Sequence, residues 1–464
     1  MKNRIVLACL GFLFAQNLLA LPKVCSPAPF CCAESQEDRV WGQANEGTLA
    51  VQPGSLLIPS PELSQEPGLV PPIMLKRDAL EAGNPLATYA AMLDLEPQYL
   101  KSKIFADYYR ELRFNFEEFM GLPLAGVRAM SLPSLSRRGQ PGVETPIPAA
   151  YQPEEALSVI EREARKTRLV ILGEEHHLPQ TRSLNEALLR LLWAQGYRYF
   201  AAETFDDRVM SDEFKYPDFR SGFYTRDPVF AAGVRTAKGL GYKLIAYETK
   251  DRGPAGDSSF RDRTQAENIK ARIFDRDPQA KVFIVAGRLH ASEEPAPGGW
   301  TPMAAVLKRL TGINPLTLFA PTMSQRLTPE EEDPYYRFAI SRGLVKKPTI
   351  FVNKAEGRFL GFEGYCDAHI FWPHIRVQGG RPDWMIRELR RKPVRIPPQL
   401  LVGQGMRLVQ AHKDGEPASA IPIDQVLIDE QSNSKVLMLP KGKYWLRTID
   451  RESTVIKKTT VLVR

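Results

Sequence analysis

The sequence predicts an α/β fold with a mostly parallel central sheet flanked by helices, followed by a small C-terminal antiparallel β module. Three observations support this prediction. Short continuous apolar runs, typical of parallel strands buried on both faces, alternate with segments of helical periodicity. Several of these runs end directly at a glutamate or a histidine. Residues 396–464 instead show short strands separated by turn signals, which indicates a β-sandwich-like module.

The first residues have the features of a secretory signal peptide over residues 1–20. Lys2 and Arg4 precede an apolar run, and Ala20 offers a small residue for cleavage. The apolar run is short for a bilayer, which disfavours a membrane anchor. A lipoprotein is the lesser alternative, because Cys9 comes too early to leave room for an apolar region. The sequence therefore predicts a periplasmic or secreted protein.

Two segments separate the signal peptide from the α/β domain. Residues 21–83 are predicted to be a Pro-rich leader, in which residues 21 to about 75, rich in Pro, Gly, Ser and Glu, are expected to be extended or disordered. Residues 84–150 begin with aromatic and aliphatic side chains at helical spacing and end in a proline-containing loop. The α/β domain itself is predicted over residues 151–395.

The α/β domain is predicted from alternating helices and strands of ordinary length. Helices are expected at 153–166, 183–195, 227–239, 260–275 and 302–310, and strands at 168–172, 198–202, 243–247, 281–286 and 316–319. Further apolar runs follow at 349–352 and 368–371. The basic segment 376–395 is interpreted as a solvated helix face or linker, with a membrane or phosphate patch as the alternative.

Polar side chains follow four of the predicted parallel strands. They are Glu174, Glu175, His176 and His177 after the first strand, Glu203 after the second, Glu248 after the third and His290 after the fourth. In open α/β sheets, ligands bind outside the carboxyl ends of the strands. These groups are therefore predicted to share one site.

Two chemistries suit this set of residues. In the first, His176, Glu203 and His290 bind a divalent metal such as zinc, manganese or iron. In the second, one histidine is held by a glutamate and activates water as a general base, without a metal. Crowded carboxylates need compensating positive charge, which a divalent metal, Arg182, or Arg261 and Arg263 could supply. Arg182, Arg261 and Asp262 are expected to bind the substrate. Both chemistries predict hydrolysis of a small-molecule or peptide substrate.

The cysteines predict disulfide bonds. Removal of the signal peptide leaves Cys25, Cys31, Cys32 and Cys366, an even number in an oxidising compartment. Because the adjacent Cys31 and Cys32 cannot easily bond to each other, a bond from Cys366 to the N-terminal cysteines is expected.

Several classes of function are disfavoured. The formal net charge of +8 is modest for this length, and no nucleic-acid-binding module is recognisable, so no nucleic-acid partner is expected. A peripheral association with the cell envelope is compatible with this charge. The absence of a G-x-S-x-G elbow and of a P-loop disfavours the usual serine hydrolases and nucleotide triphosphatases.

Two motifs within residues 165–320 resemble a known superfamily. Gly173-Glu174-Glu175-His176 resembles the G-E-x-H signature of the ChaN-like haem-binding proteins and the wider Tiki/TraB group. Glu174 and His177 fit the G-E-x-x-H spacing of the erythromycin esterases. The segment 261–268, which reads RDRTQAEN, resembles their R-D-x-x-x-A-E-N helix, and a strand ending in a histidine follows it, as His290 does here.

The resemblance implies an α/β fold with a polar site at the strand ends. It places in that site Glu174, one of His176 and His177 (with His176 favoured), Glu203 and His290, and it adds Arg261 and Asp262 as supporting residues. The superfamily includes esterases, metal-dependent proteases and haem binders. The first hypothesis is therefore an exported hydrolase of ester or peptide bonds. The alternatives are a non-enzymatic haem or metal carrier at the envelope and an interaction protein with a degenerate site.

Overall fold

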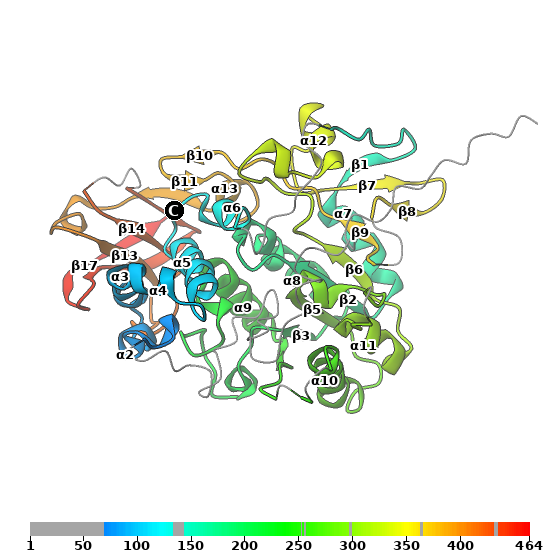
Figure 1. Ribbon diagram of the computed structural model, residues 1–464, viewed down its shortest axis with the longest axis horizontal. Coiled ribbons are helices and arrows are strands. Elements are labelled where there is room, and N and C mark those ends of the chain that lie inside the picture. The colour runs from blue at the N-terminus through cyan, green and yellow to red at the C-terminus, as the bar shows by residue number, and fades with distance from the viewer. Residues whose placement is uncertain are drawn as a thin grey trace, which may run out of the picture.

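The computed structural model describes residues 69–132, 143–251, 253–254, 257–296, 299–361, 365–430 and 435–464. Its centre is a six-stranded parallel sheet in the order β4-β3-β5-β2-β6-β9, which confirms the predicted fold class (Figure 1). The strands are β2 (Leu169–Glu174), β3 (Tyr199–Ala202), β4 (Lys243–Ala246), β5 (Val282–Gly287), β6 (Leu316–Phe319) and β9 (Ala368–His369).

Helices cover both faces of this sheet, which explains why its strands are apolar throughout. Val170 and Leu172 of β2 belong to one buried cluster, and Leu169 and Ile171 belong to another. The first cluster includes side chains of α7 (Ala156–Glu163), α8 (Asn185–Ala194) and α9 (Pro228–Leu240), and the second includes those of α10 (Phe260–Ile269), a π-helical turn (Lys270–Phe274) and α11 (Met303–Thr311).

A small antiparallel sheet lies beside the first helix of the domain. It contains β1 (Gln152–Glu155), β7 (Thr349–Asn353) and β8 (Arg358–Phe359). The helix predicted at 153–166 therefore begins only at Ala156, because Pro153 and its neighbours pair with β7. Proline is tolerated in such an edge strand, where its missing N–H breaks no ladder. The helix α12 (Pro334–Ser341) precedes β7.

The N-terminal part is helical. It contains α2 (Arg77–Glu81), α3 (Pro85–Asp94), α4 (Glu96–Lys101), α5 (Ala106–Phe119) and α6 (Ala125–Ala129) after the 3-10 turn η1 (Pro72–Met74). The turn η1 lies within the segment expected to be extended or disordered, so that prediction is wrong there, and α2 lies within the predicted leader. Their apolar side chains share a buried cluster with Leu408, Ile421 and Ile449, which ties this part to the C-terminal module.

The C-terminal module is antiparallel, as predicted. Its four-stranded sheet has the order β14-β13-β16-β17, and its remaining strands are β12 and β15, which pair with each other. Its strands are β12 (Lys392–Arg395), β13 (Arg407–Lys413), β14 (Asp424–Ile428), β15 (Val436–Leu439), β16 (Gly442–Asp450) and β17 (Val455–Val463).

The basic segment 376–395 is neither a continuous helix nor a plain linker. It forms the hairpin β10 (Val377–Gln378) and β11 (Arg381–Pro382), the short helix α13 (Trp384–Arg387) and β12. Tertiary pairing overrides the helical charge pattern here, because β12 finds a strand partner in β15.

Some predictions lie outside the described residues. These are the signal peptide and the cysteines Cys25, Cys31 and Cys32. Cys366 is buried, and its Sγ atom lies 3.7 Å from Nε2 of His369. Within the described ranges, no helix has the length and apolar character needed to cross a bilayer.

Candidate functional site

The carboxyl ends of β2, β3, β4 and β5 bring five of the predicted groups together, namely Glu174, His176, Glu203, Glu248 and His290. Glu174 ends β2 and is paired in register with Gly287, which ends β5. Glu203 follows β3, and its backbone N–H donates to the carbonyl of Val285 on β5 at 3.0 Å. His290 follows in the 3-10 turn η7 (Arg288–Ala291), and its side chain is buried like those of Glu174 and Glu203. The parallel register therefore gathers these groups at one edge.

His176 lies at the centre of this cluster. Its Nδ1 atom is 3.1 Å from Oε1 of Glu174. A neutral imidazole that donates from Nδ1 to this carboxylate has its lone pair on Nε2. The buried Nε2 has no hydrogen-bond partner and lies 3.8 Å from Oε2 of Glu203. The ring of Tyr224, in the turn η5 (Tyr224–Arg226), stacks on His176 with centroids 4.0 Å apart. The imidazole is thus fixed, with one nitrogen available as a base.

Gly287 lies against the available nitrogen of His176. A Cβ atom at this position would be 2.9 Å from Nε2 of His176 and 3.2 Å from Oε2 of Glu203. The backbone N–H of Gly287 donates to the same Glu203 oxygen at 2.6 Å. Only a residue without a side chain lets the backbone approach both groups this closely.

Arg182, in the turn η3 (Pro179–Arg182), contacts both His176 and its partner Glu174. Its Nε donates to Oε2 of Glu174 at 3.0 Å, and its Nη1 donates to Oδ2 of Asp227 at 2.9 Å. Its Nη2 donates to the backbone carbonyl of His176 at 2.6 Å. Because these contacts engage all three guanidinium nitrogens, we assign Arg182 a positioning role.

Arg261 is the second buried guanidinium of the cluster. Its Nη2 donates to Oε1 of Glu203 at 2.6 Å, and its Nε donates to Oε1 of Glu248 at 3.1 Å. Its Nη1 lies 2.8 Å from Nε2 of His290. Gln265, one turn further along α10, donates to Oε2 of Glu248 at 3.0 Å. With a side chain that is 24% exposed, Glu248 is nearest to solvent among these groups.

Glu203 is held as a carboxylate. Burial by itself would raise its pKa, but the neighbouring His290 and Arg261, together with His176 and the Gly287 N–H, lower the pKa of Glu203 well below its usual range. The negative charges of Glu248 and Glu203 in turn outweigh burial and raise the pKa of Arg261. The cluster therefore keeps a fixed negative charge beside Nε2 of His176.

Asp262 orients His290. Its Oδ1 lies 2.6 Å from Nδ1 of His290 and also accepts the backbone N–H of Met303 at 2.8 Å, while Oδ2 accepts from Nε1 of Trp300 at 3.0 Å. Burial by itself would lower the pKa of His290, but Asp262 and Glu203 outweigh it and raise that pKa. The consecutive residues Arg261 and Asp262 thus contact the two ring nitrogens of His290, Nε2 and Nδ1 respectively.

The raised pKa of His290 predicts a pH-dependent effect of Asp262→Asn. A histidine whose pKa is higher in the folded state stabilises the fold below its unfolded pKa of about 6.5 and loses that contribution as the pH rises through the folded value. The Asp262→Asn variant removes the negative charge that contributes most to raising the pKa of His290. We expect the loss in unfolding free energy to be largest below about pH 6.5 and to shrink at alkaline pH. Urea unfolding from pH 5.5 to 9 measures this, and a pH-independent difference would contradict it.

The neighbouring His177 has different surroundings. Burial, as the largest effect, lowers its pKa to about 4, and its nearest charges are Glu175 and His176. Its backbone carbonyl packs against Gly126 of α6. Glu175 accepts from Nη1 of Arg288 at 3.2 Å, and the neighbouring arginine outweighs burial to lower the pKa of Glu175. The geometry therefore places His176, and not His177, against Glu174 and Glu203.

Sequence reasoning missed two members of this arrangement. Asp227 caps α9, its Oδ1 accepting the N–H of Val229 at 2.9 Å, while its other oxygen holds Arg182. The Asp-Pro pair at 227–228 is a helix-start signal, but nothing in it indicates the arginine. Tyr224 gave no local signal, since a loop aromatic is usually a packing residue.

The predicted metal ligands His176, Glu203 and His290 do not form a metal site. Within the described ranges, no group of three or more His, Cys, Asp and Glu side chains could hold a metal ion. The oxygens of Glu203 face the guanidinium of Arg261 and the N–H of Gly287, and Nε2 of His290 faces Arg261. Tyr224 covers one face of the His176 ring, and Nε2 of His176 faces Glu203.

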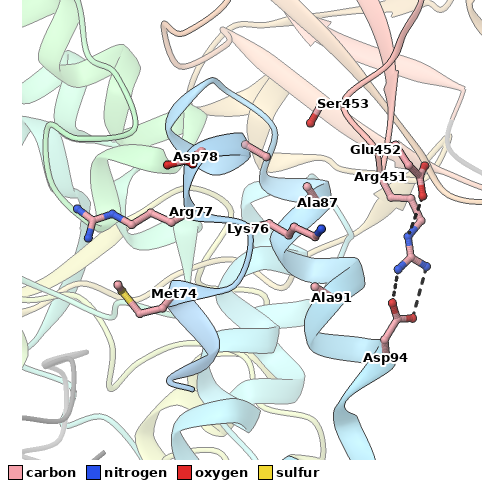
Figure 2. A pocket seen from close by; sticks show the side chains of 11 residues that line it. Met74, Lys76, Arg77, Asp78, Ala87, Ala91, Asp94, Arg451, Glu452 and Ser453 are labelled. Atoms are coloured by element: carbon pink, nitrogen blue, oxygen red, sulfur yellow. Dashed lines mark hydrogen bonds and ion pairs between the residues drawn. The ribbon is translucent and has the colours of Figure 1, made fainter. Parts of the chain in front are cut away.

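A separate cavity of about 720 Å³ lies between the N-terminal helices and the turn that joins β16 to β17 (Figure 2). An exposed ion pair between Asp94 and Arg451 crosses it. None of its lining residues belongs to the strand-end cluster, and the predicted functional groups do not reach it.

No family model and no curated protein matches the chain. Solved structures give remote likenesses. The type III effector HopBA1 is 14% identical, with a TM-score of 0.26, over 40% of this chain and 95% of that one. The ChaN protein of Campylobacter jejuni, which binds haem cofacially, is 11% identical, with a TM-score of 0.27, over 40% of this chain and 94% of that one. A MARTX toxin effector domain from Vibrio vulnificus is 12% identical, with a TM-score of 0.26, over 50% of this chain and 47% of that one. Because these likenesses are so remote, they do not indicate an activity. An activity has to be inferred from the strand-end cluster.

Proposed function

We propose that the protein is an exported, metal-independent hydrolase of ester or peptide bonds in which His176 is the general base. One observation supports this most strongly. His176 is oriented through Nδ1 by Glu174, while its buried Nε2 has no hydrogen-bond partner and lies 3.8 Å from the Glu203 carboxylate. An imidazole that is oriented through one nitrogen by a carboxylate can take a proton from water at its other nitrogen.

In the proposed reaction, Nε2 of His176 takes a proton from a water molecule as the water oxygen bonds to the substrate carbonyl carbon. The carbon–oxygen or carbon–nitrogen bond to the leaving group then breaks, and the imidazolium returns the proton to that group. Glu203 stabilises the transient imidazolium, since its lowered pKa keeps it charged. Arg261 and the Gly287 N–H hold Glu203 in place.

The close approach of Gly287 predicts the effect of adding one methyl group. Gly287→Ala would place a Cβ atom 2.9 Å from Nε2 of His176, so the imidazole must shift. We expect kcat to fall roughly a hundredfold, because small displacements of a catalytic group cost about that much. Gly239→Ala on α9 is the matched control, since a Cβ there meets no atom within 4 Å. Steady-state kinetics on both variants would contradict the assignment if Gly287→Ala kept wild-type kcat.

The proposal is tested by screening the full mature protein against ester and peptide substrates, with and without a chelator. We expect hydrolysis that survives chelation and disappears in the double variant His176→Ala, His290→Ala. If wild type and double variant are equally inert across both substrate classes, the hydrolase proposal fails. Activity that is lost on chelation and restored by zinc, manganese or iron would overturn its metal-independent form.

A further inference from the structure

The segment 376–395 exposes apolar and basic side chains together. Val377 is 43% exposed and Ile386 is 40% exposed. Arg376, Arg390 and Arg395 are exposed as well, and no described residue forms an ion pair with any of the three. These five residues are called the 376–395 surface below. It shares no residue with the strand-end cluster.

Backbone contacts bring the parts of this segment together. The N–H of Asp383 donates to the carbonyl of Arg376 at 2.8 Å, and the N–H of Arg391 donates to the carbonyl of Met385 at 3.0 Å. The hairpin tip at Gly379 lies beside Val436, and Val436 is the register partner of Arg395. Figure 1 shows β10, β11 and α13 adjacent to one another at one side of the molecule. Residues from both ends of the segment thus lie close together.

The segment is firmly attached to the rest of the protein. Trp384 and Met385 are buried in a cluster with Val229 and Met438. The guanidinium of Arg391 donates to the carbonyl of Ile423 at 2.9 Å. Val377 and Ile386 are therefore exposed on a segment whose buried side chains are well packed.

The acidic groups within this segment do not cancel its positive charge. Asp383 and Glu388 both pair with a single arginine, Arg387. Burial raises the pKa of Glu388 to about 7, so part of its negative charge is lost near neutrality. The segment contains seven basic and two acidic residues, and Arg376, Arg390 and Arg395 are exposed members of the basic majority that form an ion pair with no described residue.

We propose that the 376–395 surface docks the protein onto a bilayer that contains anionic lipids. Exposed apolar side chains that enter the interfacial region, flanked by arginines that reach the phosphates, are the combination that peripheral membrane surfaces use. Each basic residue near an anionic surface contributes about 1 kcal/mol, which is about fivefold in affinity. Three arginines therefore favour anionic over neutral bilayers by about a hundredfold, and salt weakens this preference.

Vesicle flotation of the full chain tests the proposal, with phosphatidylglycerol–phosphatidylcholine vesicles compared with pure phosphatidylcholine. We expect binding to the anionic vesicles at 0.1 M salt and release at 1 M. The triple variant Arg376→Gln, Arg390→Gln, Arg395→Gln should bind about a hundredfold more weakly. Val377→Ser with Ile386→Ser should also weaken binding and should leave the salt dependence in place. Thermal unfolding checks that the variants fold.

A charge-matched control separates this surface from the overall basic charge. Arg276, Arg309 and Arg342 are also exposed, no described residue forms an ion pair with any of them, and replacing all three with glutamine changes the net charge equally. We expect this control to bind nearly as wild type does. Equal losses in the two triple variants, equal binding to neutral vesicles, or no flotation of the wild type would each overturn the proposal. Binding to a soluble polyanion without vesicle binding would overturn it as well.

Discussion

Replacing Arg182 with methionine is expected to lower the free energy of unfolding by about 3–5 kcal/mol. The fully buried guanidinium of Arg182 pairs with two buried carboxylates, Glu174 and Asp227. Methionine keeps much of the volume but leaves both carboxylates without a counter-charge in a low-dielectric environment. Breaking a buried ion pair from one side has this size of effect because the remaining charge stays desolvated.

Urea unfolding of Arg182→Met measures this loss. Arg165→Met is the control, because the Arg165–Glu161 pair is exposed and should contribute less than about 1 kcal/mol. Adding Asp227→Asn to Arg182→Met should recover part of the loss, since one uncompensated charge is then removed. If the unfolding free energy of Arg182→Met lay within about 1 kcal/mol of the wild-type value, the stabilising role of Arg182 would be contradicted.

Replacing His176 with glutamine is expected to lower kcat roughly a hundred- to ten-thousand-fold, the usual contribution of a positioned general base. Glutamine can still donate a hydrogen bond to Glu174 but offers no basic nitrogen toward Glu203. The matched change His177→Gln alters a buried histidine one residue away that has neither of these contacts. We expect kcat per folded molecule in His177→Gln to stay within a few-fold of wild type.

Steady-state kinetics on both variants, normalised to the folded fraction, decide between the two histidines. If His177→Gln lost as much kcat as His176→Gln, the choice of base would be wrong. KM should change little in His176→Gln, because the base acts on water and not on the ground-state substrate.

The sheet and the strand-end residues could be predicted because both follow from local patterns. Apolar runs buried on both faces mark parallel strands, and parallel strands present their carboxyl ends at one edge. Glu174, Glu203 and His290 therefore could be placed together before any geometry was known. The order of the strands and the side from which each side chain enters depend on tertiary packing.

The metal prediction illustrates what residue types alone leave open. His176, Glu203 and His290 are reasonable metal ligands by chemistry, and the structure does bring them together. Helix α10 also brings in Arg261, whose guanidinium faces both Glu203 and His290. The compensating charge that crowded carboxylates need is thus supplied by a side chain, and sequence spacing cannot show which cation fills that role.

The error in the N-terminal leader has a different cause. Proline-rich composition predicts extended chain, yet Pro72 occupies the first position of a helical element. Proline is favoured at that position, because its fixed φ suits the first turn and no hydrogen bond is lost. Composition averaged over a window hides this positional effect. The buried cluster that includes η1 and α2 also contains side chains of α3, α5 and the distant strands β13 and β16.

Chemical rescue of His176→Ala tests most directly whether the imidazole at this position is the base. The substitution leaves a space between Tyr224 and Glu174 that free imidazole can enter. With chelator present, we expect added imidazole to restore a measurable part of kcat, with a saturating dependence on the concentration of its neutral form. No restoration by imidazole, together with recovery of activity on adding a divalent metal to chelated wild type, would contradict a metal-independent His176 base.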